Sequence, residues 1–147
     1  MTTTADHTLL RRAIALAAEA RETGNPPYGS LLAAPDGTIL AEDRNTTLTD
    51  HDITAHPELK LARWAAARLD AATAAATTMY TSCEPCTMCA AVIQQAGLGR
   101  VVFALSGEQL LTIRPGSNRP PVPQEGPALL EEVRAVVEPY YSGAGRP

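Results

Sequence analysis

The three cysteines of this chain, Cys83, Cys86 and Cys89, all lie within seven residues of one another. The cysteines of a disulfide-stabilised fold are spread along the chain, because each bridge stabilises the fold by closing a loop. A cluster as tight as this one indicates metal binding or redox chemistry instead. The fold must therefore be one that places these thiols at a metal or redox site.

The length and composition are those of one folded domain. A chain of 147 residues suits a single core, so we predict one domain over residues 1–147. Apolar residues make up 45% of the chain and charged residues 19%, a composition too apolar for a disordered protein. We therefore expect a globular fold along the whole chain.

The charge pattern bears on partners and location. The net charge is −4, and the twelve basic residues are scattered along the chain rather than gathered in the stripe that a nucleic-acid binder uses to contact phosphates. No segment is long and apolar enough to span a membrane, and residues 1–7 lack the charged-then-apolar pattern of a secretion signal. We expect a cytoplasmic protein with neither a nucleic-acid nor a membrane partner.

Hydrophobic periodicity and turn residues predict alternating helices and strands. In chain order the predicted elements are a helix (residues 6–22), a hairpin (28–34 and 38–42), a helix that begins near His56, a strand (76–82), a helix (86–96), a strand expected to be buried (100–105), a short helix (106–113) and a last helix (127–137), followed by a tail. Strands that alternate with helices favour an α/β sandwich with a mixed sheet between helical layers.

Two fragments carry the metal-binding residue types. His56 stands in the first, and Cys86 and Cys89 stand in the second. Three such ligands with a water in the fourth position make a catalytic zinc site, so we expect Zn2+ as the cofactor. Each fragment lies at a predicted helix N-terminus, where the helix dipole lowers the pKa of a thiol. Cys83 is expected to be a small buried residue, since a fourth protein ligand would close the position of the water.

Glu58 follows His56 by two residues and is the predicted catalytic residue. Because a helical turn holds 3.6 residues, its side chain points away from that of His56 and need not bind the same ion. It can instead act on the water at the metal as a proton carrier, since zinc brings the pKa of that water to about 7.

The two fragments resemble the zinc-dependent cytidine and nucleobase deaminase superfamily, whose signature is H-x-E followed by P-C-x-x-C. Within this superfamily, residues 52–58 and 84–90 are most similar to guanine deaminases and tRNA adenosine deaminases, and next to the fungal-type cytosine deaminases. The resemblance extends over residues 27–104.

The resemblance implies a three-layer α-β-α sandwich with a central mixed five-stranded sheet. It implies zinc held by His56, Cys86 and Cys89, and Glu58 as the acid and base of a hydrolytic deamination. The implied substrate is a small amino-substituted heterocycle, above all a free nucleobase such as guanine or cytosine, or a related aminopyrimidine or triazine. A homodimer is the implied assembly.

Substrate contacts are also implied residue by residue. Asn45, eleven residues before the histidine, matches an asparagine that hydrogen-bonds the substrate ring, and Tyr28 matches the wall residue of a proline–aromatic–glycine segment. The remaining implied contacts line the pocket within or beside the two metal-binding fragments: Ala55, Ser82 and Glu84. For Glu84, an exposed turn position is an equal alternative.

Two other functions remain open. The first is the same chemistry on a nucleoside or on a tRNA adenosine, which the acidic balance of the chain disfavours. The second is a non-catalytic, zinc-stabilised binding domain. Glu58 disfavours this second alternative, because a structural metal site has no use for an acid that faces an open coordination position.

Some features depart from the family pattern or lack an assigned role. Pro57 stands where the related proteins carry a small residue such as alanine. Residues 138–147, which include Tyr140 and Tyr141, align with no subfamily. Leu61 and Trp64 lie off the predicted inward stripe of their helix, so we expect them at a subunit interface or beneath a loop.

Overall fold

The computed structural model describes residues 1–114, 116 and 119–143. The chain divides into two compact units, Met1–Gly116 and Ser117–Pro147. Each unit is described by itself, and one domain over residues 1–147 stays a prediction.

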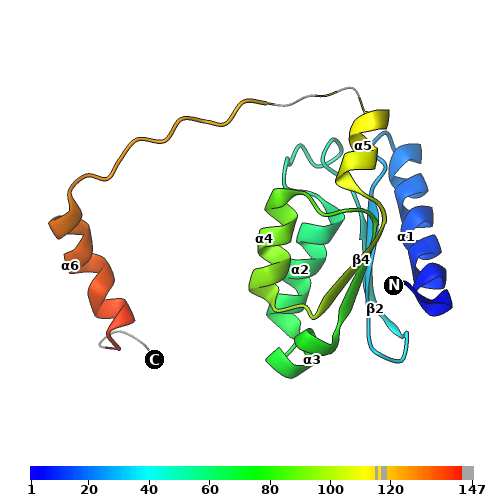
Figure 1. The fold of residues 1–147 in the computed structure, drawn as a ribbon, viewed down its shortest axis with the longest axis horizontal. Helices are drawn as coiled ribbons and strands as arrows, with labels where there is room; N and C mark the ends of the chain where they lie inside the picture. Colours follow the sequence, from blue (N-terminus) through cyan, green and yellow to red (C-terminus); the bar gives the residue numbers. More distant parts are fainter. Residues whose placement is uncertain (115, 117–118, 144–147) are drawn as a thin grey trace. The chain divides into compact units, whose positions relative to one another are not determined.

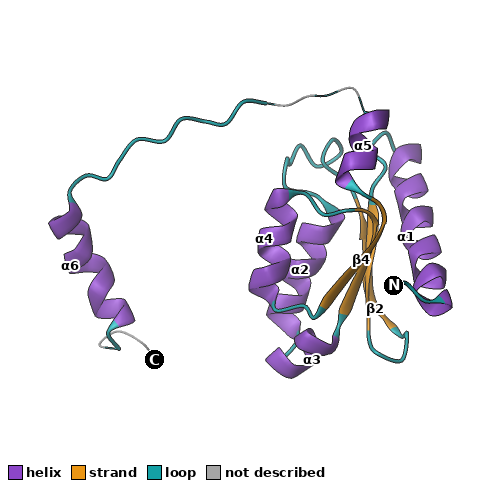
Figure 2. Cartoon of the chain, viewed as in Figure 1, coloured by secondary structure: helices purple, strands orange, loops and turns teal. Residues whose placement is uncertain are grey.

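The first unit is a sheet covered by helices on both faces (Figures 1 and 2). Its elements are α1 (Thr4–Glu22), β1 (Gly29–Ala33), β2 (Ile39–Arg44), α2 (Pro57–Arg68), α3 (Ala71–Ala76), β3 (Thr78–Cys83), α4 (Thr87–Ala96), β4 (Arg100–Leu105) and α5 (Gly107–Ile113). Helix α1 covers one face of the sheet, and α2 and α4 cover the other. The predicted three-layer α/β sandwich is confirmed.

The sheet is mixed, with strand order β2-β1-β3-β4. Strand β1 pairs antiparallel with β2 and with β3, whereas β3 and β4 are parallel. The prediction of five strands is wrong, because the described part of the chain forms four. After β4 the chain forms α5, and the described residues 119–129 then carry four prolines, which lack the N–H that a strand ladder needs.

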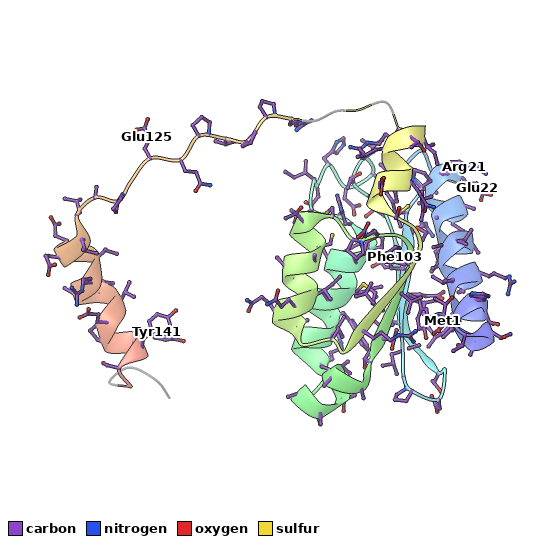
Figure 3. The ribbon with its side chains drawn as sticks, viewed as in Figure 1. Met1, Arg21, Glu22, Phe103, Glu125 and Tyr141 are labelled. Carbon is purple, nitrogen blue, oxygen red and sulfur yellow. The ribbon has the colours of Figure 1, made fainter. Side chains whose placement is uncertain are left out.

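Strand β4 was predicted to be buried, and this is also wrong. In the described part of the chain it is the last strand of the sheet, and β3 alone pairs with it. Val102 is buried, but Phe103, labelled in Figure 3, is 39% exposed. A run of apolar residues in the sequence does not distinguish an edge strand from a central one.

Two clusters of buried apolar side chains lie on opposite faces of the sheet. One fills the space between the sheet and helices α2 and α4: Leu32, Leu61, Ala62, Ala65, Met79 and Ile93. The other packs beneath α1: Leu10, Leu31, Ala33, Tyr80 and Val102. Leu61 was expected at a subunit interface or beneath a loop, yet it is 2% exposed within the first cluster, because α2 packs on both the sheet and α4 and buries more than one stripe. Trp64 packs against the first cluster and is partly buried.

Gly29 sets how closely α1 approaches the sheet. A Cβ built there would lie 2.5 Å from the carbonyl oxygen of Ala13, from the backbone nitrogen of Ala17 and from the Cβ of Leu16. Only a glycine permits this approach of helix to strand. The close packing fixes the start of β1, directly after Tyr28.

Asp6 is a buried carboxylate that ties α1 to β3 and β4. Its Oδ1 accepts hydrogen bonds from the Tyr80 hydroxyl at 2.7 Å and from Arg100 Nη1 at 2.9 Å. Its Oδ2 accepts from Arg100 Nη2 at 3.0 Å and from the Thr3 N–H at 2.8 Å. The Thr3 hydroxyl accepts from the Asp6 N–H in return, which completes a capping box at the start of α1.

Replacing Asp6 with Ala is expected to lower the free energy of unfolding by about 2–4 kcal/mol, because hydrogen bonds to a charged group are each worth about 1.5–3 kcal/mol. The substitution would also leave the Tyr80 hydroxyl without its partner. Urea unfolding monitored by circular dichroism measures the difference. A loss below about 0.5 kcal/mol, the range of ordinary surface substitutions, would contradict this account.

The same variant has an expected pH dependence. Hydrogen bonds from Arg100, from the Thr3 N–H and from Tyr80 hold the pKa of Asp6 well below its usual range. A carboxyl with a depressed pKa stabilises the fold above its unfolded pKa, about 3.9, and this stability is lost as the pH falls through the folded pKa. The difference between wild type and Asp6→Ala should therefore be full at neutral pH and shrink below about pH 4. A constant difference would refute the assignment.

The second unit contains α6 (Leu130–Tyr141). The helix begins three residues later than predicted, and it includes Pro139, Tyr140 and Tyr141, which were expected in a tail. The two tyrosine rings meet edge to face, with centroids 5.1 Å apart. None of the helices in the described ranges has the length and apolar character needed to cross a membrane.

Candidate active site

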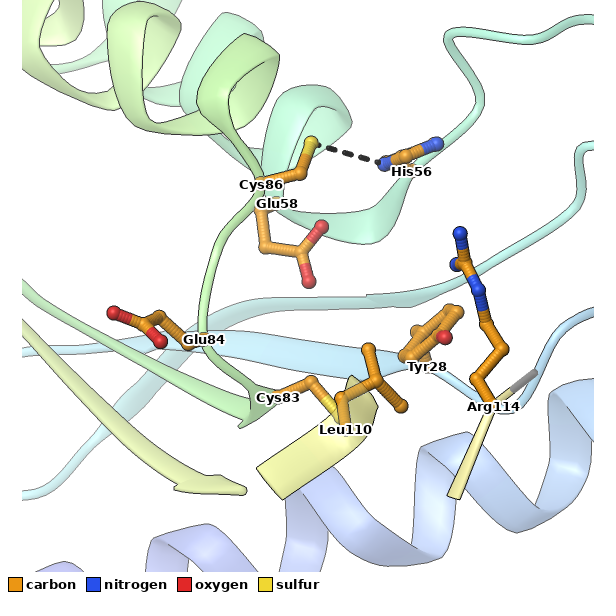
Figure 4. A pocket seen from close by; sticks show the side chains of 8 residues that line it. All are labelled: Tyr28, His56, Glu58, Cys83, Glu84, Cys86, Leu110 and Arg114. Atoms are coloured by element: carbon orange, nitrogen blue, oxygen red, sulfur yellow. Dashed lines mark hydrogen bonds between the residues drawn. The ribbon is translucent and has the colours of Figure 1, made fainter. Parts of the chain in front are cut away.

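The three predicted metal ligands meet where α2 and α4 begin, and Figure 4 shows two of them, His56 and Cys86. His56 is the N-cap residue of α2, and the buried Pro57 occupies the first turn, where its missing N–H costs nothing. Cys86 is the N-cap residue of α4, and Cys89 lies in the first turn of the same helix. Because α2 and α4 pack against each other, their N-termini bring the two fragments together across thirty residues of sequence.

The geometry of this cluster fits a tetrahedral zinc ion. His56 Nδ1 lies 3.7 Å from Cys86 Sγ and 3.5 Å from Cys89 Sγ. All three ligand atoms lie within 4.8 Å of one another. Zn–S and Zn–N bonds of about 2.3 and 2.0–2.1 Å at tetrahedral angles require an S···N separation of about 3.6 Å. The two separations between the nitrogen and the sulfurs therefore match the spacing that zinc requires.

Electrostatics at the cluster favour a thiolate. The adjacent Cys89 side chain, followed by a hydrogen bond from His56, holds the pKa of Cys86 well below that of a free thiol. The hydrogen bond with Cys86 in turn raises the pKa of His56. Cys86 also stands at the positive end of the α4 dipole, which favours an anion. Cys86 thus favours the thiolate form, which is the form of cysteine that binds a metal.

Glu58 lies beside the cluster and is 5% exposed. Its Oε1 accepts a hydrogen bond from Thr81 Oγ1 at 2.9 Å, and its Oε2 accepts from the Cys89 thiol at 3.5 Å. Burial raises the pKa of Glu58, while the hydrogen bond from its own backbone N–H and the one from Thr81 act in the opposite direction. The carboxylate is thus held next to the ligands without being one of them.

The cluster opens onto a cavity of about 90 Å³. Its lining residues come from four regions of the first unit: Tyr28, His56, Glu58, Cys83, Glu84, Cys86, Leu110 and Arg114. In Figure 4 the Glu58 carboxylate points into this space, whereas that of Glu84 points away from it. A small compound in the cavity would face both the metal ligands and Glu58.

Of the predicted substrate contacts, Tyr28 lines the cavity and Asn45 does not. Tyr28 is half-buried and lines the cavity. Asn45 is 1% exposed and is not among the residues that line it. The Asn45 Oδ1 accepts hydrogen bonds from the N–H and the hydroxyl of Thr47, both at 2.9 Å, so this oxygen already stabilises the loop after β2.

The other predicted contacts have structural partners. Ala55 is buried, and its N–H and C=O both take part in backbone hydrogen bonds of the loop before α2. The Ser82 hydroxyl accepts from the Gly29 N–H at 3.1 Å. Glu84 is exposed, and its Oε2 accepts from the Gly107 N–H at 2.6 Å, so the carboxylate caps the start of α5. The turn alternative for Glu84 therefore has a structural basis, although Glu84 also lines the cavity.

Sequence reasoning missed Leu110 and Arg114 at the cavity and Thr81 beside Glu58. Leu110 lies in α5 and Arg114 is the C-cap residue of that helix. The sequence predicted the helix but not its position beside the cavity. The only signal in the sequence is that both residues follow β4. This strand runs parallel to β3, which leads into the cysteine fragment. Cys83, expected to be buried, is 8% exposed at the end of β3, and burial raises the pKa of its thiol.

Comparison with known proteins agrees with this site. Residues 3–105 match the cytidine and deoxycytidylate deaminase zinc-binding region. The guanine deaminase of Bacillus subtilis is 40% identical over 98 residues, which cover 66% of this chain and 62% of that protein. The tRNA-specific adenosine deaminase of Haemophilus influenzae is 34% identical over 101 residues, which cover 69% and 58%. The matches thus span less than two thirds of either relative.

The solved structure of the Bacillus subtilis guanine deaminase superposes on 96% of this chain and on 96% of its own, with a TM-score of 0.77 and 28% sequence identity. The family match covers both metal-binding fragments and the whole sheet. With the ligand geometry and the fold in agreement, the chain belongs to the zinc-binding cytidine and deoxycytidylate deaminase family.

Proposed function

We propose that this protein is a zinc-dependent hydrolytic deaminase of a free nucleobase, with guanine as the first candidate substrate. The observation that carries the proposal is the buried Glu58 carboxylate, which lines a small cavity with His56 and Cys86 and accepts a hydrogen bond from the Cys89 thiol. A purely structural zinc site would have no use for a proton-carrying acid at this position. The similarity to guanine deaminase over nearly the full chain supports the choice of substrate.

The cofactor contributes one part of the chemistry. His56 Nδ1, Cys86 Sγ and Cys89 Sγ would hold it, since these atoms have the separations described above. When bound, zinc supplies a Lewis acid that makes water a nucleophile near neutral pH. The two helix N-termini stabilise the thiolates that hold the ion.

Glu58 performs the proton transfers. It takes a proton from the attacking water as the C–O bond forms at the ring carbon that bears the amino group, and it delivers this proton to the adjacent ring nitrogen. It then takes the second water proton and gives it to the amino group as the C–N bond breaks. The products are ammonia and the oxo form of the base. Burial raises the pKa of Glu58 and so brings it nearer the working pH of an acid and base.

The remaining residues shape the pocket for a flat ring. Tyr28 covers one face, and a base stacked on an aromatic side chain gains about 1–3 kcal/mol. Asn45 does not line the cavity and its Oδ1 is engaged with Thr47, so a contact with the ring would have to come from its Nδ2 amide, a hydrogen-bond donor. Guanine offers ring nitrogens and a carbonyl oxygen as acceptors for such a donor. Glu84, which lines the cavity, would contact the ring at the rim, whereas Ala55 and Ser82 would support the loop and strand beside the cavity through the hydrogen bonds described above.

A tRNA adenosine is the second candidate, favoured by the similarity to the Haemophilus influenzae tRNA-specific adenosine deaminase. A net charge of −4 without a basic stripe offers little electrostatic attraction for a polyanion, so we rank it below a free base. A homodimer, a cytoplasmic location and the absence of a nucleic-acid or membrane partner stay predictions.

Ammonia release from a panel of compounds tests the assignment. The panel contains guanine, cytosine and an aminotriazine, the matching nucleosides, and a tRNA anticodon stem-loop with adenosine at the wobble position. We expect turnover of a free base, with guanine the fastest. Activity on nucleosides alone or on the stem-loop alone would overturn the free-base assignment. No activity on any compound, with zinc bound, would favour the non-catalytic binding domain.

A further inference from the structure

Two buried hydroxyls link Glu58 to the sheet. The Ser30 hydroxyl donates a hydrogen bond to Thr81 Oγ1 at 2.7 Å, and Thr81 Oγ1 donates to Glu58 Oε1 at 2.9 Å. Ser30 and Thr81 are fully buried, and Glu58 is 5% exposed. The three side chains thus form a continuous hydrogen-bonded chain that ends on the carboxylate.

The strand register explains why the hydroxyls lie together. Ser30 of β1 pairs directly with Thr81 of β3, two residues along from the pair formed by Leu32 and Met79. Side chains two residues apart in a strand share a face, so all four lie on the face covered by α2 and α4. This face is apolar at Leu32 and Met79 and becomes polar where Glu58 approaches.

The direction of the hydrogen bonds from Ser30 to Thr81 and from Thr81 to Glu58 follows from the number of protons available. Each hydroxyl has one proton, and a buried hydroxyl without a partner costs free energy. Because Ser30 donates to Thr81, the Thr81 proton is free to be given to an acceptor. The Gly29 carbonyl oxygen lies 3.5 Å away and Glu58 Oε1 only 2.9 Å, so the carboxylate is the closer acceptor.

This arrangement makes the two carboxylate oxygens unequal. Oε1 is held by Thr81, whereas Oε2 lies 3.5 Å from Cys89 Sγ, on the side of the metal ligands. We propose that Thr81, supported by Ser30, is a positioning residue that fixes the Glu58 carboxylate so that Oε2 is the oxygen that transfers protons. The role in proton transfer rests on the proposed deaminase function, whereas the orientation of the carboxylate does not.

Three variants test the proposal. Thr81→Val keeps the shape of the side chain and removes the hydroxyl, and Thr81→Ser keeps the hydroxyl. Thr77→Val is the matched control, because Thr77 is 1% exposed and its hydroxyl donates to the Thr73 carbonyl at 2.8 Å, outside the cavity. Both valine variants lose one buried hydroxyl, but only one of those hydroxyls contacts Glu58.

Misplacement of a catalytic group by about 1 Å costs up to about 10²-fold in rate, so we expect Thr81→Val to lower kcat roughly 10- to 100-fold. KM should stay within about threefold, since substrate binding is not altered. Thr81→Ser should restore kcat, Thr77→Val should leave kcat unchanged, and all three should bind zinc as wild type does. Wild-type kcat in Thr81→Val, or an equal loss in Thr77→Val, would overturn the proposal.

Crystal structures of wild type, Thr81→Ser and Thr81→Val provide a readout that needs no activity. We expect the same Glu58 rotamer in the first two and a rotated carboxylate in the third. One rotamer in all three would overturn the positioning role, even if the enzyme is active. If wild type deaminates no compound of the panel, the proposed function fails, while the comparison of rotamers still decides whether Thr81 orients Glu58.

Discussion

Replacing Glu58 with Gln is expected to lower kcat by roughly 10²–10⁴-fold, the usual contribution of a general acid–base group. The amide has the shape of the carboxylate, and its oxygen can still accept the hydrogen bond from Thr81. It cannot take a proton from water or return one to the ring. We therefore expect zinc content to be unchanged and Tm to stay within about 3 °C of wild type, a difference of no more than about 1 kcal/mol.

Glu84 provides the comparison, because it is the other acid at the cavity. Its carboxylate caps α5 through the Gly107 N–H, and among the described residues it makes no hydrogen bond with the metal ligands or with Glu58. Glu84→Gln should therefore lower kcat by less than about tenfold. Steady-state kinetics on the best compound of the panel measure both variants. A Glu58→Gln enzyme within a few-fold of wild type, or a larger loss in Glu84→Gln, would show that another group carries the proton.

The metal ligands could be predicted from the sequence because their geometry is local. Cys86 and Cys89 occupy the cap and the first turn of one helix, and His56 caps another. Short-range periodicity and the proline at the start of α2 locate both helix starts. Only the proximity of the two helix ends depends on the tertiary fold, and that proximity was predicted from the family resemblance.

The surroundings of Glu58 depend on long-range pairing and could not be predicted in this way. Ser30 and Thr81 are 51 residues apart, and only the register of β1 with β3 places their hydroxyls together. Shifting that register by one residue would turn Thr81 to the opposite face of the sheet. Nothing in the local sequence of either strand distinguishes these hydroxyls from ordinary strand residues.

The wrong strand count and the missed burial of Leu61 have related causes. A fifth strand was inferred from the resemblance, but the prolines in residues 119–129 do not support a ladder. A single inward stripe was assumed for α2, but this helix contacts both the sheet and α4. In both cases the mispredicted property depends on neighbouring elements in the tertiary fold, which the local sequence does not specify.

Replacing Cys89 with Ala is expected to reduce bound zinc from about one ion per chain to a trace, since a catalytic zinc site depends on three protein ligands. Cys89 is fully buried, and its sulfur lies 3.5 Å from His56 Nδ1. Cys83→Ala is the matched control, because Cys83 is also buried and also close in sequence but lies outside the ligand cluster. Elemental analysis after gel filtration compares the three proteins.

Thermal unfolding gives a second measure of the same site that needs no substrate. An ion that binds only the folded state stabilises it by about 2.7 kcal/mol when its free concentration is 100 times Kd. Wild type and Cys83→Ala should therefore gain roughly 5–10 °C in Tm when zinc is added to the chelator-treated protein. Cys89→Ala should not respond, because a histidine and one thiolate do not complete the site. A zinc-dependent Tm in Cys89→Ala, or its loss in Cys83→Ala, would mean that the ion is held by a different set of residues. Glu58 would then no longer stand beside the water that it is proposed to activate.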